Sequence, residues 1–215
     1  MQRLRIRFSR GEELKYISHL DLIRLWQRAL NRAGMPLSYS KGFNPHPQIS
    51  VAQALAMGVT SDAELMDIFL DKFVSPHTFT AAIDRQLPRG VSLDGVYNTP
   101  LIMPSLQSQV RQAEYKVEIE TDQDQNTIES ALNALLEKET LPWQHQRDTG
   151  PHKYDLRTLV DDLWLIDFRP GRCAIGMRLR SDGSGAGRPE QVAAALGFEK
   201  YPASIHRSKL ILQAN

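Results

Sequence analysis

The residues best able to do chemistry in this sequence lie in one short loop, residues 41–47, which reads Lys-Gly-Phe-Asn-Pro-His-Pro. Phe43 offers a planar face for stacking, and Asn44 and His46 can donate and accept hydrogen bonds. The two prolines push the residues before them toward extended conformations, and Gly42 tolerates a positive φ. The pattern predicts a constrained loop that holds its polar groups still, as a binding site requires. The alternative is a rigid turn that binds nothing, in which His46 makes its hydrogen bonds within the protein.

An amphipathic helix should precede this loop. Ser18, with Asp21 three residues later, is typical of a helix N-cap with an acid in the first turn. Gly34 and Pro36 predict the end of the helix. The apolar residues recur at steps of three and four, which places them on one buried face: Leu22, Ile23, Trp26, Ala29, Leu30 and Ala33.

Three arginines form a cationic stripe on the opposite face of this predicted helix, because Arg24, Arg28 and Arg32 are spaced by four residues. Residues 1–50 contain nine Lys or Arg and three Asp or Glu, a net charge of +6, whereas the remainder carries 17 basic and 22 acidic residues. This asymmetry favours an anionic partner for the N-terminal part, although a solvated basic face is the simpler explanation. Together with the aromatic residues Tyr16, Tyr39, Phe43 and Tyr154, this positive charge predicts a surface that binds RNA by stacking on its bases and neutralising its phosphates. The predicted RNA-binding residues are Arg24, Arg28, Arg32, Lys41, Phe43, Asn44, His46 and Tyr154.

Catalytic and metal chemistry are weakly signalled. The six histidines, at positions 19, 46, 77, 145, 152 and 206, form no metal-ligand spacing. There is no CxxxCxxC motif for an iron–sulfur cluster, and Cys173 lies in an alternating pattern that favours a buried, inert thiol. The Gly/Ser-rich residues 183–189 resemble a phosphate-binding loop but lack its lysine, so a flexible connection is the simpler interpretation. We predict no catalytic residue, no metal and no cofactor.

Composition places the chain among ordinary globular proteins, since 41% of its 215 residues are hydrophobic and 24% are charged. No apolar run approaches the length of a membrane span, and the N-terminus lacks the apolar core of a signal peptide. A single cysteine fits a reducing compartment. These features predict a cytoplasmic protein without a membrane partner.

The predicted elements give the same order twice, with one short extra strand in the first half: strand, helix, strand, strand, helix, strand. This order predicts an α+β protein made of two tandem ferredoxin-like sandwiches, with domains at residues 1–100 and 113–215. The Pro-, Ser- and Gln-rich residues 99–112 are predicted to be the linker. The first half has strands near residues 3–8, 37–40, 48–55, 63–72 and 91–98, and helices at 18–33 and 75–86. The second has strands near 115–120, 156–168, 172–180 and 204–213, and helices at 126–138 and 189–196.

One long segment carries a resemblance to a known family. Residues 15–50 read KYISHLDLIRLWQRALNRAGMPLSYSKGFNPHPQIS, which resembles the signature of the radical SAM-linked protein family, a domain of unknown function. The resemblance continues at residues 152–157, 187–189 and 205–207, and thus covers most of the chain. Members are encoded beside, or fused to, a radical SAM protein, often near genes for an RNase E/G-type nuclease and a ribosomal protein. The resemblance brings no established activity, but it adds Arg157 to the predicted RNA-binding residues.

Three functions compete on this evidence. The first is a non-catalytic accessory protein that presents RNA, such as tRNA or rRNA, to a radical SAM enzyme for modification or processing. The second is a metal-independent endoribonuclease, by analogy in fold order with CRISPR-type RNA-processing enzymes. The third is a protein–protein adaptor whose basic stripe docks on an acidic partner and ignores RNA. We rank them in this order.

Overall fold

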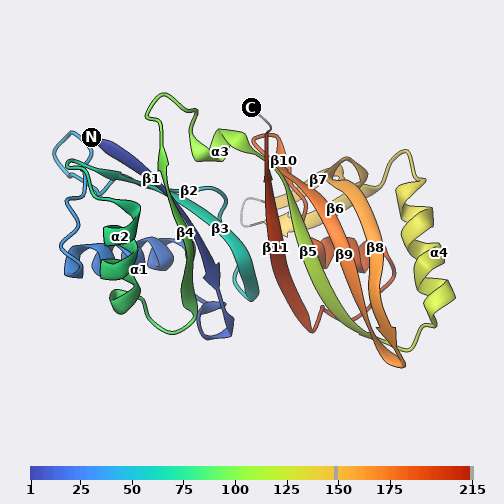
Figure 1. Cartoon of the computed structure of the whole chain (residues 1–215). Helices are drawn as coiled ribbons and strands as arrows, with labels where there is room; N and C mark the ends of the chain where they lie inside the picture. The colour runs from blue at the N-terminus through green and yellow to red at the C-terminus, as the bar shows by residue number, and fades with distance from the viewer. Residues whose placement is uncertain (148–149, 214–215) are drawn as a thin grey trace. The chain divides into compact units, whose positions relative to one another are not determined.

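A computed structural model of the chain describes residues 1–147 and 150–213 and shows a mixed α+β protein. The chain divides into two compact units, Met1–Val110 and Arg111–Asn215, and each contains its own strands and helices (Figure 1). Every strand pair of defined register is antiparallel. Within the described residues, no helix is long and apolar enough to cross a bilayer. The predicted α+β class is therefore confirmed.

The sheet of the first unit is built around its first strand. Strand β1 pairs with β3 on one side and β4 on the other, and the short β2 pairs with β3. The order across the sheet is therefore β4-β1-β3-β2. The elements of this unit are β1 (Gln2–Arg10), α1 (His19–Arg32), β2 (Ile49–Val51), β3 (Val59–Leu70), α2 (Pro76–Ile83), β4 (Val91–Thr99) and α3 (Leu106–Gln109).

One face of this sheet carries the hydrophobic core. Alternate side chains of β1, including Phe8, are fully buried against α1 and α2, because successive residues of a strand point to opposite faces. The Phe8 and Trp26 rings meet edge to face, with centroids 5.0 Å apart. Burying each such side chain contributes about 1.5–3 kcal/mol. Helices α1 and α2 thus share one face of the sheet (Figure 1).

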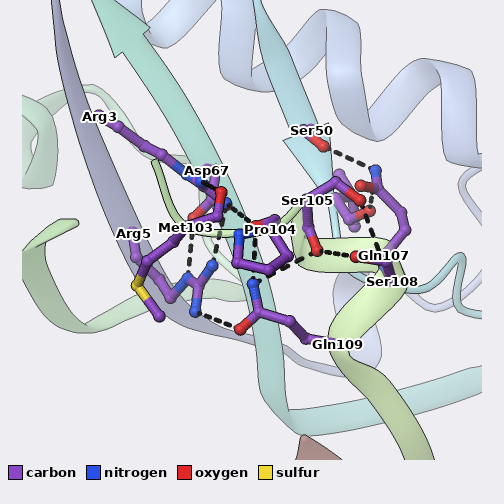
Figure 2. Close-up of polar contacts among 11 residues, drawn as sticks. Arg3, Arg5, Ser50, Asp67, Met103, Pro104, Ser105, Gln107, Ser108 and Gln109 are labelled. Atoms are coloured by element: carbon purple, nitrogen blue, oxygen red, sulfur yellow. Dashed lines mark hydrogen bonds and ion pairs between the residues drawn. The ribbon is translucent and has the colours of Figure 1, made fainter. Parts of the chain in front are cut away.

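The opposite face of β1 carries a buried ion cluster. Arg3 and Arg5 both bind Asp67 of β3, with contacts of 2.5 and 2.9 Å, and the Asp67 side chain is only 1% exposed. The remaining guanidinium donors of Arg3 reach the carbonyls of Met103 and Pro104 at 2.8 and 2.9 Å (Figure 2). Arg3, Arg5 and Arg7 alternate with apolar residues in the sequence, a pattern that predicts a strand with a cationic face in solvent. For Arg3 and Arg5 that prediction is wrong, because Asp67 on the paired strand neutralises them.

The segment that covers this cluster is ordered, although its composition predicted a linker. Ser105 caps the short helix α3 by accepting a hydrogen bond from the Ser108 amide. Gln107 donates to Ser50 Oγ and to the Val51 carbonyl, which fixes α3 against β2 (Figure 2). Residues 100–109 therefore close the second face of the first sheet. The Pro, Ser and Gln residues of this segment form turns and helix caps. Because turns and caps have no regular spacing of apolar residues, the sequence pattern did not reveal them.

The second unit has a central strand, β9, that pairs with β5 on one side and with β8 and β10 on the other. Strand β11 lies next to β5. On the β8–β9 ladder, a Cβ at Gly176 would come within 1.9 Å of the Trp164 indole, so only glycine lets this ring lie across the strand. The elements are β5 (Val110–Thr121), α4 (Gln125–Leu136), β8 (Val160–Arg169), β9 (Gly171–Asp182), β10 (Gly185–Ala186), α5 (Pro189–Ala195) and β11 (Ser204–Leu212).

A hairpin of two further strands, β6 (Pro142–Arg147) and β7 (Gly150–Asp155), forms a separate small sheet in the second unit. The sequence did not predict it. The strand predicted at residues 37–40 is absent, and only isolated bridges form at Leu37 and Tyr39. The strand predicted at residues 48–55 is present but shorter, as the three residues of β2. Residues 156–159 form a 3₁₀ turn before β8.

Candidate functional site

Helix α1 presents the predicted arginine stripe. Ser18 caps the helix by accepting a hydrogen bond from the Asp21 amide at 3.1 Å, as its position in the sequence predicts. Leu22, Trp26 and Leu30 are buried on one face, and Arg24, Arg28 and Arg32 are all exposed on the other. The helix therefore has one face fixed in the core and one cationic face in solvent.

The stripe is only partly neutralised by its surroundings. Arg24 forms an exposed ion pair with Asp21 at 3.2 Å, and Arg32 donates to the Gln86 carbonyl at 3.0 Å. The hydrogen bond from Ser18, followed by the charges of Arg24 and Arg28, lowers the pKa of Asp21. The one carboxylate thus acts on Arg24 and Arg28, and Arg32 bonds a neutral carbonyl. Exposed pairs of this kind contribute little to stability, so the arginines can exchange partners at small cost.

The loop at residues 41–47 closes on itself. The Ser40 amide donates to the His46 carbonyl at 2.8 Å, and the His46 amide donates to Ser40 Oγ at 3.0 Å. An isolated β-bridge between Tyr39 and Pro47 joins the two ends of the loop. Gly42 has a φ of 132°, a backbone angle that residues with a side chain rarely adopt. Between these ends Lys41, Phe43, Asn44 and His46 are exposed, and the Phe43 ring is completely so. The loop presents an aromatic ring to solvent from a closed base.

Fewer basic residues of the N-terminal part reach solvent than the sequence charge implies. Arg3 and Arg5 are paired with Asp67. Arg10 is 1% exposed, and its guanidinium donates to the carbonyls of Ala56 and Val59 at 2.7 and 2.8 Å. The accessible positive charge of this unit therefore depends more heavily on α1 and on Lys41 than the net charge of residues 1–50 suggests.

A pocket of about 380 Å³ lies in the second unit between the β6–β7 hairpin and the β9–β10 turn. Its lining includes His145, His152 and Tyr154 from the hairpin, and Ser184 and Arg188 from the segment that follows β9. His145 faces His152 directly across the hairpin register, so the ring-bearing residues share one face of the hairpin. The pocket brings together two segments that the family resemblance singled out, residues 152–157 and 187–189.

The ring cluster has defined geometry. The His152 and Tyr154 rings are stacked with an interplanar angle of 27° and centroids 5.3 Å apart, and His145 meets His152 edge-on at 5.6 Å. The Tyr154 hydroxyl donates to Gln191 Oε1 of α5, which also lines the pocket. Tyr154 is therefore held between the hairpin and a helix.

The Gly/Ser segment after β9 is a tight turn and not a flexible connection. Asp182 accepts from the Ser184 amide at 2.8 Å and from its hydroxyl, and with Arg180 these bonds lower the pKa of Asp182 to about 2. A Cβ at Gly187 would come within 2.8 Å of the Leu159 carbonyl, so glycine permits close packing here. The turn forms one wall of the pocket.

Arg157 has a structural role in this unit. Its guanidinium donates to the carbonyls of Leu136 and Lys138, at the C-terminal end of α4, and to that of Val160. Cations at this end of a helix satisfy carbonyls that lack helical partners. These bonds occupy the donors that the sequence analysis assigned to RNA, and contact between Arg157 and RNA stays a prediction.

Other predictions about reactive groups concern residues away from these surfaces. Cys173 is buried, and burial raises the pKa of its thiol, which fits an inert cysteine. Among the described residues, no group of three or more His, Cys, Asp or Glu side chains could hold a metal ion. The sequence analysis named Tyr154 but missed His145, His152, Arg188 and Gln191 as pocket residues. Trp143 and His145 are two residues apart, and so are His152 and Tyr154. This alternation was the sequence signal that could have predicted the hairpin and its ring-bearing face.

Comparisons with known proteins identify a family and a fold. No curated protein matches the sequence. Among solved structures, a chain of a Cbf5–Nop10–Gar1 complex is similar over 96% of this chain and 48% of its own length, with a TM-score of 0.54 and 9% identity. A chain of an H/ACA RNP bound to a substrate RNA containing 2′-deoxyuridine has a TM-score of 0.49 and 9% identity, over 95% of this chain and 46% of its own. This chain thus spans about half the length of these two chains. At 9% identity, the likeness to the first of them shows the fold alone.

A family model matches residues 3–189, most of the chain, and its description names no radical SAM enzyme. The protein belongs to the family described as uncharacterized protein conserved in bacteria, DUF2344.

Proposed function

We propose that this protein is a non-catalytic RNA-binding protein whose interface is formed by the α1 stripe (Arg24, Arg28 and Arg32) and the exposed loop (residues 41–47). One observation carries the proposal: three exposed arginines stand on a helix whose other face is buried in the core. Such a helix presents its cations at fixed spacing, and regularly spaced cations suit a chain of phosphates.

The loop supplies what the stripe lacks. Arginines contact phosphates without regard to base identity, whereas aromatic rings stack on unpaired bases. The Phe43 ring is fully exposed, and placing an apolar ring in water is unfavourable unless a partner covers it. Asn44 and His46 beside it can read base edges. These roles favour unpaired RNA over a smooth duplex.

The finer elements of the proposal rest on the family resemblance and the element order. The RNA is tRNA or rRNA, presented to a radical SAM enzyme that is the partner, because residues 15–50 resemble the radical SAM-linked signature. Each unit is a ferredoxin-like sandwich. The sheet order β4-β1-β3-β2 in the first unit, and the β8-β9-β5-β11 order in the second with a hairpin inserted, support this assignment.

Replacing Arg24, Arg28 and Arg32 together with glutamine should weaken RNA binding and flatten its salt dependence. Each arginine that faces a phosphate releases about one counterion, so the slope of log affinity against log salt should fall in magnitude by about 2–3. Glutamine is nearly as good a helix former as arginine, so the fold should survive. Fluorescent tRNA titrated at several salt concentrations measures the slope, and circular dichroism checks the fold.

A matched control removes three exposed cations elsewhere: Arg169, Arg172 and Lys200 replaced with glutamine. This variant has the same net charge as the first and should retain the wild-type slope. Equal slopes in all three proteins would disprove the interface, and binding of a protein partner through the stripe would then support the adaptor. Cleavage of the RNA by the wild type alone, without metal, would support the nuclease.

A further inference from the structure

We infer that the pocket between the β6–β7 hairpin and the β9–β10 turn binds a single nucleotide. This site lies within the second unit, so the inference does not depend on RNA binding by the α1 stripe. The argument rests on three features of the pocket: its aromatic wall, one side-chain amide and one arginine.

The aromatic wall suits a planar ligand. His145, His152 and Tyr154 line the pocket together, and their contacts with one another hold the rings at centroid distances of 5.3–5.7 Å. Rings that are already fixed lose little entropy when a base stacks on them. Stacking on such residues is worth about 1–3 kcal/mol per base. The Trp143 ring continues the same face of the hairpin, because its partner in the register is Tyr154.

Gln191 supplies a hydrogen-bond donor to the base. Its Oε1 accepts the hydrogen bond from the Tyr154 hydroxyl. The Nε2 group is then left to donate, and within the described residues it has no hydrogen-bond partner. This donor can pair with a carbonyl of uracil, cytosine or guanine, or with a ring nitrogen of adenine.

Arg188 supplies the phosphate contact. It lines the pocket and is exposed, and its guanidinium makes no hydrogen bond or ion pair with any residue that the structure describes. A guanidinium matches phosphate oxygens with two parallel hydrogen bonds. The one carboxylate among the lining residues, Asp155, accepts from the amides of Leu141 and Arg157 at 2.8 and 3.0 Å. These bonds offset its repulsion of a phosphate.

The volume sets the size of the ligand. At about 380 Å³ the pocket falls at the small end of ligand sites, which range from about 300 to 1,000 Å³. This space suits one nucleotide and excludes a dinucleotide. The nucleotide is either a free monophosphate or one residue of an RNA strand, and the chemistry of recognition is the same.

Isothermal titration of the full chain with UMP, GMP, AMP, uridine, inorganic phosphate and a short oligouridylate tests the inference. UMP, GMP and AMP should each bind at least tenfold more tightly than uridine or phosphate. Tighter binding of oligouridylate than of UMP would support the inference with RNA as the source, and the reverse with a free nucleotide. Absence of binding by every nucleotide up to millimolar concentration would overturn it, as would equal affinity for phosphate and UMP.

Variants separate this site from a general charge effect. Arg188→Gln should weaken UMP or oligouridylate at least tenfold. Lys153→Gln removes the same charge from an exposed position on the hairpin and should change the affinity less than twofold. Tyr154→Phe keeps the ring but removes the hydroxyl that bonds the Gln191 amide, so the affinity for UMP should fall. Equal affinities for Arg188→Gln, Lys153→Gln and the wild type would overturn the inference, whatever the α1 stripe does.

Discussion

Replacing Asp67 with asparagine should lower the free energy of unfolding by about 3–5 kcal/mol, the usual penalty for removing one partner of a buried ion pair. Asp67 accepts four hydrogen bonds from Arg3 and Arg5, at 2.5 to 3.1 Å. The Arg3 side chain is only 3% exposed, so its charge would stay buried without a counterion. Urea denaturation followed by circular dichroism measures the change.

The control for this variant is Asp62→Asn, which makes the same chemical change at an exposed position of the same strand. It should shift the free energy of unfolding by less than about 0.5 kcal/mol. A similar loss of unfolding free energy in both variants would show that the buried cluster contributes no more to stability than an exposed aspartate does. If Asp67→Asn does not fold, Arg5→Met should show a smaller, measurable loss, because the Arg5 side chain is 13% exposed.

Replacing Arg157 with leucine should destabilise the second unit by about 2–3 kcal/mol. The guanidinium satisfies three backbone carbonyls, and the hydrogen bonds of a charged donor contribute about 1.5–3 kcal/mol each before non-additivity. The leucine leaves the Leu136 and Val160 carbonyls without this donor. Thermal and urea unfolding of the full chain measure the loss.

Arg169→Leu is the matched control, because Arg169 is 73% exposed and pairs only with the exposed Asp167 among the described residues. Its effect should be within about 0.5 kcal/mol. Full stability of Arg157→Leu, combined with a clear loss of tRNA affinity, would reverse the assignment and restore Arg157 to the RNA interface.

The elements with strong local signals could be predicted from the sequence. Ser18 caps its helix where the sequence predicted. The helix predicted at residues 75–86 begins as its sequence favours, with Ser75 as the cap and Pro76 in the first turn. Alternation correctly marked β1, β5 and β9. The β6–β7 hairpin was not predicted, because the residues that share one of its faces are His, Tyr and Trp. These residues contribute little to a pattern of alternating apolar and polar residues. The pairing of the hairpin depends on contacts that no local window contains.

The candidate site divides in the same way. The α1 stripe follows from helical spacing alone, so it is readable in the sequence. The pocket is not, because Tyr154 and Gln191 are 37 residues apart and meet only in the folded unit. Arg3, Arg5 and Arg7 look alike in the sequence. The strand register places Asp67 opposite Arg5. Only this register distinguishes Arg3 and Arg5, which pair with Asp67, from Arg7, which is exposed.

The position of residues 100–109 has a consequence for synthesis on the ribosome. Strand β1 is made before its partners, because Arg3 pairs in register with Phe69 and Thr99 and donates to the carbonyls of Met103 and Pro104. Because the chain emerges from its N-terminus, the first unit can form its helix-covered core while its charged face is still bare. A ribosome that stops just after β4 would release a unit with a closed core and an uncovered ion cluster.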